Sequence, residues 1–200
     1  MRRFLNRESN FSDPVPSPTK AAAILETQCA CCGKDLTELL SLAYMAPDTW
    51  PHARTPVANS LFLDTQGDVL TEDFCRIGDK LFVRAIMSFP ILESDEALIF
   101  GVWGSLSKEN FETYLKTFDS GEQGQLDLMF SWLNNYGFYE TSAAIPCILQ
   151  PRDDRQRPVM VVAQEDHPLF AKQSDGLDWK EVTKFLQNAG HLNSNDTNAT

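Results

Sequence analysis

Two apolar runs, KLFVRAIMSFPIL at residues 80–92 and ALIFGVWGSL at residues 97–106, decide the fold of this 200-residue chain. Both are rich in the β-branched and aromatic residues that pack well in sheets. Between them stand four polar residues, Glu-Ser-Asp-Glu at 93–96, which have the length and polarity of a hairpin loop. The two runs are therefore predicted to be long central strands that pair antiparallel.

Elsewhere the apolar spacing changes to that of amphipathic helices. After Ser107, a good N-cap, apolar residues recur at the i, i+3, i+4 and i+7 positions. Asp178 with Glu181 forms a capping box, and Gly190 is a typical C-terminal stop. On such grounds helices are predicted over residues 35–43, 107–118, 126–133 and 178–190, and short strands over residues 143–149 and 158–163.

Strands mixed with helices, without regular strand–helix–strand alternation, indicate the α+β class. We expect a mostly antiparallel sheet covered by three or four short helices, with disordered N- and C-terminal ends. Prolines at alternate positions near the start keep the chain extended, and the last residues are almost all small and polar. The expected organisation is a flexible tether at residues 1–20, a single globular domain at residues 21–190 and a disordered polar tail at residues 191–200.

The formal net charge is −11, which makes the chain strongly acidic. Such a field disfavours nucleic acid and anionic membranes, whereas it would steer a basic protein partner towards the surface. No run approaches the roughly 18 apolar residues of a membrane span, and no signal-peptide core follows Arg2 and Arg3. A cytoplasmic location is therefore expected, and no oligomeric state is predicted.

The five cysteines are an odd number without a small secreted scaffold around them, so they are interpreted as reduced thiols. Cys29 and Cys32, followed by Gly33, form a C-x-x-C-G knuckle in which two thiolates reach one zinc ion. Cys31 lacks that spacing and is expected to stay out. Cys75 is the first candidate to complete the site. Other candidates are His52, Cys147 and His167, and the alternative is that the cysteines are structural and hold no metal.

No catalytic residue is predicted, because the chain lacks the common phosphate-binding, zinc-protease and nucleophile-elbow motifs, and no base stands beside Cys75. Arg84 interrupts an apolar strand, so its charge must be paired, with Asp73 as first choice and Glu93 as the alternative. The candidates for ligand binding are polar or aromatic residues within or near the predicted strands and loops: Asp73, Arg84, Trp103, Arg157 and His167.

Several short motifs lie between Cys29 and about Gly176. They are Cys29-x-x-Cys32-Gly33, Ala46-Pro47-Asp48, Asp73-Phe74-Cys75-Arg76-Ile77, Phe82-Val83-Arg84, Gly101-Val102-Trp103, Arg157-Pro158 and His167-Pro168-Leu169. In these motifs the chain resembles the bacterial domain of unknown function 2199 family. The resemblance implies a histidine three residues after the knuckle glycine, where this chain has Leu36, and it implies no activity.

Two functions therefore stand beside each other. The first is a non-catalytic, acidic domain that binds another protein. The alternative is a small ligand-binding or enzymatic domain with a polar site near Asp73, Cys75, Arg84 and His167, stabilised by zinc.

Overall fold

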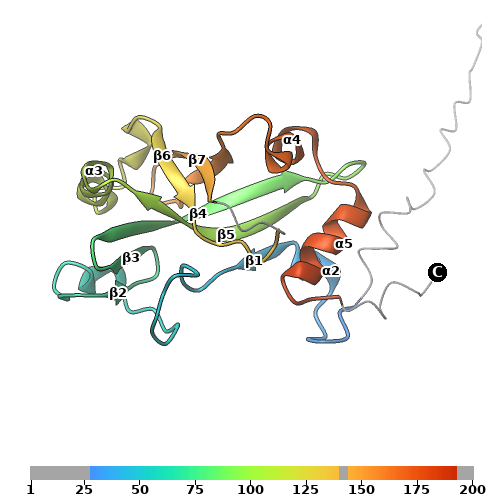
Figure 1. Cartoon of the computed structure of the whole chain (residues 1–200), viewed down its shortest axis with the longest axis horizontal. Helices are drawn as coiled ribbons and strands as arrows, with labels where there is room; N and C mark the ends of the chain where they lie inside the picture. Colours follow the sequence, from blue (N-terminus) through green and yellow to red (C-terminus); the bar gives the residue numbers. More distant parts are fainter. Residues whose placement is uncertain (1–27, 140–143, 193–200) are drawn as a thin grey trace, which may run out of the picture.

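The predicted hairpin forms the centre of the fold. The computed structural model describes residues 28–139 and 144–192. In it β4 (Lys80–Pro90) and β5 (Ala97–Leu106) pair antiparallel over their whole length, as predicted. Figure 1 shows the two long strands running through the molecule, with every other element arranged around them.

Three more strands close this hairpin into a barrel. β6 (Met129–Leu133) pairs with β5, β7 (Ile145–Gln150) with β6, and β8 (Val159–Val162) with β7, all antiparallel. The ring closes where β8 meets β4 in parallel. Most pairs are antiparallel, as expected, but a closed five-stranded barrel was not predicted from the sequence.

Shorter strands extend the sheet on both sides. β3 (Phe74–Ile77) pairs antiparallel with β4, and β2 (Val69–Leu70) pairs with β3. β1 (Ser41–Ala43) lies parallel to β5. The strand order is β1-β5-β6-β7-β8-β4-β3-β2, with the additional β5–β4 pairing.

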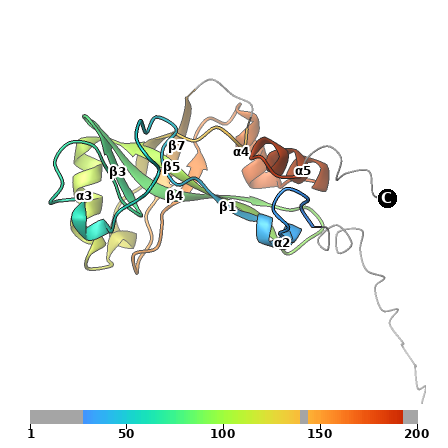
Figure 2. The same cartoon turned by 90° about the horizontal axis from the view of Figure 1, so that it is seen from below.

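Helices gather at the two ends of the central hairpin. Figures 1 and 2 agree that α3 (Lys108–Phe118) lies by one end, while α2 (Leu36–Leu39), α4 (Pro168–Asp175) and α5 (Trp179–Asn188) lie by the other. Two single turns of 3-10 helix, η1 (Asn59–Leu61) and η2 (Gln123–Gln125), complete the elements of the described residues. None of the helices found there has the length and apolar character needed to span a bilayer.

The helix predictions were confirmed for α3 and α5, in which an N-cap residue precedes a long amphipathic pattern. Ser107 accepts a hydrogen bond from the backbone N–H of Asn110 at the start of α3, and the capping box of Asp178 and Glu181 opens α5. These side chains satisfy backbone donors that a helix otherwise leaves unpaired at its first turn. Both helices therefore begin at the predicted residues.

One helix prediction was confirmed only at its start, and another was wrong. The helix expected over residues 35–43 stops at Leu39, because the next residues pair with β5 as β1. The helix expected over residues 126–133 is instead strand β6, in which Met129, Ser131 and Leu133 are buried while the residues between them are exposed. That alternation is the period of two that a half-buried strand requires.

The buried side chains form one large core and a small second cluster on the other side of the hairpin. Aromatic rings in stacked, tilted and edge-to-face contact fill the large core between the barrel and α5, among them Phe89, Phe100, Phe138 and Phe185. The second cluster consists of Ala46, Leu70, Cys75, Phe82 and Trp103. It contains Phe82 of β4 and Trp103 of β5.

Asn135 fastens the chain that covers this second cluster. Its side-chain oxygen accepts the backbone N–H of Trp103 at 2.8 Å, and its Nδ2 donates to the Ala46 carbonyl at 3.1 Å and to Asp48 Oδ1 at 2.9 Å. Asn135 is fully buried. Three satisfied hydrogen bonds compensate the cost of burying its amide.

The predicted tether at residues 1–20 and residues 193–200 of the predicted tail lie outside the described residues. The first two residues assigned to the tail do not behave as a tail. Leu192 is only 5% exposed and belongs to the large core. The folded part therefore extends two residues beyond the predicted boundary.

Candidate metal centre

The knuckle at residues 28–35 is a tight reversal of the chain. The Cys29 N–H donates to the Lys34 carbonyl at 2.9 Å, and the Gly33 N–H donates back to the Cys29 carbonyl at 2.7 Å. Gly33 has φ +70°, in the left-handed region that glycine adopts without steric cost. Gln28 and Asp35 form an isolated bridge that closes the reversal. This geometry gathers the three thiols of Cys29, Cys31 and Cys32 in one turn.

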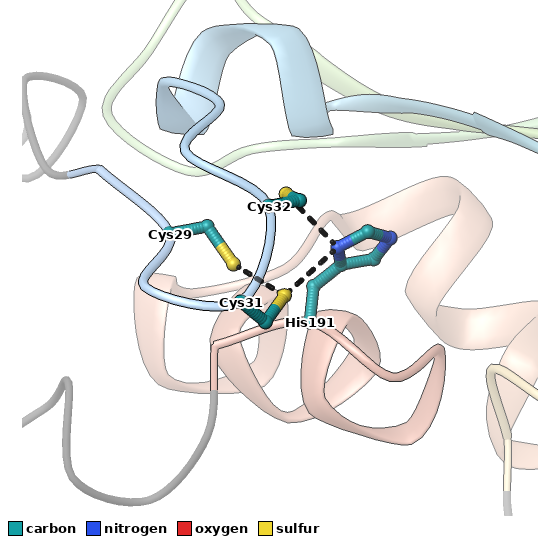
Figure 3. Close-up of side chains that lie close together, drawn as sticks. All are labelled: Cys29, Cys31, Cys32 and His191. Carbon is teal, nitrogen blue, oxygen red and sulfur yellow. Dashed lines mark hydrogen bonds between the residues drawn. The ribbon is translucent and has the colours of Figure 1, made fainter.

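The end of α5 supplies a fourth group. The Gly190 N–H donates to the Gln187 carbonyl and the His191 N–H to the Leu186 carbonyl, at 2.9 and 2.8 Å. With Gly190 at φ +89°, these bonds form a Schellman motif, which ends a helix and turns the following residue away from its axis. His191 is thereby held facing the knuckle (Figure 3).

The four side chains converge. His191 Nδ1 lies 3.7 Å from Cys31 Sγ and 3.7 Å from Cys32 Sγ, and the Sγ atoms of Cys29 and Cys31 are 2.9 Å apart. One ligand atom from each of the four residues lies within 4.8 Å of the others. Figure 3 shows the sulfur atoms of Cys29 and Cys31 and the imidazole of His191 facing one another between the two segments, with Cys32 beside them.

Burial and hydrogen bonds make Cys29 the most distinct of the thiols. It is completely buried, and its sulfur accepts the Leu192 N–H at 3.4 Å. Burial opposes its ionisation, yet hydrogen bonds from Cys31 and from the Leu192 N–H outweigh that effect and lower its pKa to about 6. The shared bond raises the pKa of Cys31 to about 11. Thiolate is the form that binds metal ions.

This donor set fits a metal ion. Three thiolates and one imidazole are a complete tetrahedral set for zinc, with Zn–S distances of about 2.3 Å and Zn–N distances of about 2.0–2.1 Å. Sulfur atoms on such an ion lie about 3.8 Å apart, so the Cys29–Cys31 pair would open slightly. Cys29, Cys31, Cys32 and His191 could therefore hold a metal ion.

Half of this cluster was predictable from the sequence. Cys29 and Cys32 are in it, but Cys31, which was expected to stay out, lies between Cys29 and His191. Leu36, where the family resemblance implied a histidine, is instead a buried core residue. His191 was overlooked because the signal that points to it, a helix-ending glycine directly before it, says nothing about distance to the knuckle.

The other proposed ligands lie elsewhere. Cys75 and Cys147 are fully buried in apolar surroundings, where burial raises the pKa of each to about 12. His52 pairs with Asp68 at 3.0 Å. His167 caps α4, where its Nδ1 accepts the Leu169 N–H at 3.2 Å. None of the four belongs to the cluster found in the described residues.

Four of the five candidate ligand-binding residues meet in a second place. The Asp73 carboxylate pairs with Arg157 Nε at 2.8 Å, and the Asp73 carbonyl accepts the backbone N–H of Arg84 at 2.8 Å. The Arg84 guanidinium lies 6.0 Å from the ring centre of Trp103. The fifth residue, His167, is accounted for by capping α4.

Arg84 does not pair with the Asp73 carboxylate, so the predicted ion pair was wrong. Arg84 is buried as predicted, with 8% of its surface exposed. The oxygens of the Asp73 carboxylate, however, are taken by Arg157 and by the Asn59 amide, the latter at 2.8 Å. The Arg84 guanidinium instead donates to the Glu72 carbonyl at 3.3 Å.

One family model matches most of the chain. A family model described as an uncharacterized protein conserved in bacteria (DUF2199) matches residues 28–177. The match contains the three knuckle cysteines and ends before His191. No curated protein and no solved structure matches the chain.

Proposed function

The chain belongs to the DUF2199 family of uncharacterized proteins conserved in bacteria, and on this premise we propose that it is a non-catalytic binding domain stapled by a structural zinc ion. The observation that carries the proposal is the closed set of four ligand atoms from two distant segments. Structural zinc sites use four protein ligands, whereas catalytic sites keep one position open for water or substrate. Four ligands favour a structural role.

Zinc is the ion that this donor set suits best. Thiolates and imidazole select soft or borderline metals over magnesium and calcium, and a tetrahedral set of sulfur and nitrogen ligands is typical of zinc. Once bound, the ion would hold the knuckle against the end of α5, where Leu192 and Cys29 are already packed together. Its contribution would therefore be to folding free energy.

The binding role rests on charge. A formal net charge of −11 gives the surface a negative field, which attracts a basic partner and raises its association rate at low ionic strength. The partner we propose is therefore a basic protein. Partners recovered at low salt should be basic and should dissociate as salt is raised. Recovery of acidic partners that resist salt would contradict this part of the proposal.

Elemental analysis of purified protein tests the staple. We expect about one zinc per chain in the wild type. Each of Cys29→Ser, Cys31→Ser, Cys32→Ser and His191→Ala should bind zinc at least tenfold more weakly. Cys147→Ala is the matched control, because it removes a buried thiol outside the cluster and should keep its zinc. Wild type without zinc, or an unchanged zinc affinity of His191→Ala in competition with a chelator, would refute the staple.

A further inference from the structure

Three arginines lie together on the loop between β7 and β8 and line an open pocket. Its volume is about 340 Å³. The walls come from the β7–β8 loop, from β4 and from the turn before β3, and the lining residues are Asp73, Ile86, Arg152, Arg155, Gln156 and Arg157. Three arginines and one aspartate give the lining residues a net charge of two positive units, although Asp153 and Asp154 stand beside them on the same loop.

Two of these guanidinium groups are held in place through their Nε atoms. Arg152 Nε donates to the Arg157 carbonyl at 2.7 Å, and Arg157 Nε donates to Asp73 Oδ1 at 2.8 Å. Within the described residues their terminal Nη groups make no hydrogen bond. An arginine fixed in this way presents a pre-organised pair of donors, so little entropy is lost when an anion binds.

The third arginine fixes the loop itself. Arg155 Nε donates to the Phe118 carbonyl at 3.2 Å, and its Nη2 donates to the Asp119 carbonyl, at the C-terminal end of α3. Asp154 and Arg155 both have φ near +60°, an unusual conformation for residues other than glycine. The contact with α3 holds this strained turn in one shape, which positions its neighbours Arg152 and Arg157.

Beneath the pocket lies a buried positive charge without an ion pair. Arg84 shares a face of β4 with Ile86, which lines the pocket. Its Nε has no hydrogen-bond partner, and among the described residues no carboxylate lies within ion-pair distance of it. Burial, and then the charge of Arg157, lower the pKa of Arg84, and the carboxylates of Asp73 and Glu72 offset this only in part. A buried guanidinium beside a second one is costly unless negative charge compensates it.

We propose that this pocket binds a phosphate group, with the Nη atoms of Arg152 and Arg157 as direct donors and the buried charge of Arg84 behind them. A phosphate monoester carries close to two negative charges at neutral pH, which matches the excess of the lining residues. Guanidinium groups bind phosphate oxygens through paired hydrogen bonds, a geometry that lysine does not offer. The pocket is independent of the metal centre, since it shares no residue with it.

Thermal unfolding of the full zinc-loaded chain tests this site, with inorganic phosphate as the probe. Phosphate should raise the melting temperature in a saturable manner, and sodium chloride at equal ionic strength should not. Arg152→Gln should weaken phosphate at least tenfold, as expected when hydrogen bonds to a charged group are lost. The phosphate affinity of Arg152→Lys should lie between those of the wild type and Arg152→Gln, since lysine keeps the charge but loses the paired donors. Arg54→Gln removes an exposed arginine that does not line the pocket and should respond as the wild type does.

Three outcomes would decide against the proposal. Equal phosphate responses in Arg152→Gln and wild type would refute it, as would a chloride effect of the same size. Acetate binding as tightly as phosphate would replace the phosphate site by a carboxylate site. If Arg152→Gln does not fold, the comparison of Arg152→Lys with Arg54→Gln carries the test. A wild-type chain that binds phosphate but contains no zinc would leave this site intact and would refute the structural zinc ion.

Discussion

Ending the chain after Gly190 rather than after Leu192 should destabilise the protein and remove most of its response to zinc. The shorter chain lacks His191, one of the four metal-binding groups, and Leu192, a core residue. It also loses two backbone hydrogen bonds, from His191 to the Leu186 carbonyl and from Leu192 to the Cys29 sulfur.

The magnitude follows from these losses. Burial of a leucine side chain contributes about 1.5–3 kcal/mol. Each hydrogen bond adds about 1 kcal/mol. Without metal, the shorter chain should therefore be less stable by about 3–5 kcal/mol. For a chain of this size that is a fall in melting temperature on the order of 10 °C.

Zinc should widen the difference. A ligand present at about a thousand times its Kd stabilises the folded state by about 4 kcal/mol, so the chain that ends at Leu192 gains strongly. The chain that ends at Gly190 keeps the three thiols of the knuckle and should gain much less. Circular dichroism melts of both chains, in reducing buffer with chelator and with zinc, give the four values needed. Equal melting temperatures in chelator, or equal shifts with zinc, would refute the reasoning.

Three further predictions concern the core. Asn135→Ala should lower the free energy of unfolding by about 3 kcal/mol, because it leaves buried groups unpaired. The neighbouring Asn134→Ala should lower it by less than about 1 kcal/mol. Chemical denaturation of both variants measures the two losses, and equal losses would contradict the role given to the Asn135 hydrogen bonds. Gly104→Ala should cost about 2 kcal/mol, since its Cβ would collide with side chains inside the barrel, and an unchanged melting temperature would argue against that packing. In native metal-free protein, alkylation monitored by mass spectrometry should modify the exposed Cys32, should modify Cys31 more slowly because its pKa is raised, and should spare the buried Cys75 and Cys147. Rapid labelling of either buried thiol would be the contrary result.

Local signals in the sequence predicted the local parts of the fold. The β4–β5 hairpin was predictable because two β-prone runs flank a polar loop of four residues. The starts of α3 and α5 were predictable because capping depends only on residues three or four positions apart. Strand β6 was not, because its apolar residues fit the helical spacing and the alternating one equally well.

Long-range features could not be read in the same way. Closure of the barrel depends on a parallel contact between β4 and β8, at Ile86 and Val159, which leaves no mark in either segment. The metal centre joins residues about 160 positions apart, so spacing predicted only the knuckle half. Arg84 was correctly predicted to be buried, but its partner was missed because Arg157 binds Asp73 from a distant loop.

X-ray absorption spectroscopy at the zinc edge, on the purified full chain, tests the central claim most directly. If Cys29, Cys31, Cys32 and His191 all bind, the first shell contains three sulfur atoms at about 2.3 Å and one nitrogen at about 2.0–2.1 Å. His191→Ala should remove the nitrogen contribution and leave the sulfur shell. A wild-type shell with only two sulfur atoms, or one completed by water oxygen, would contradict a closed structural site.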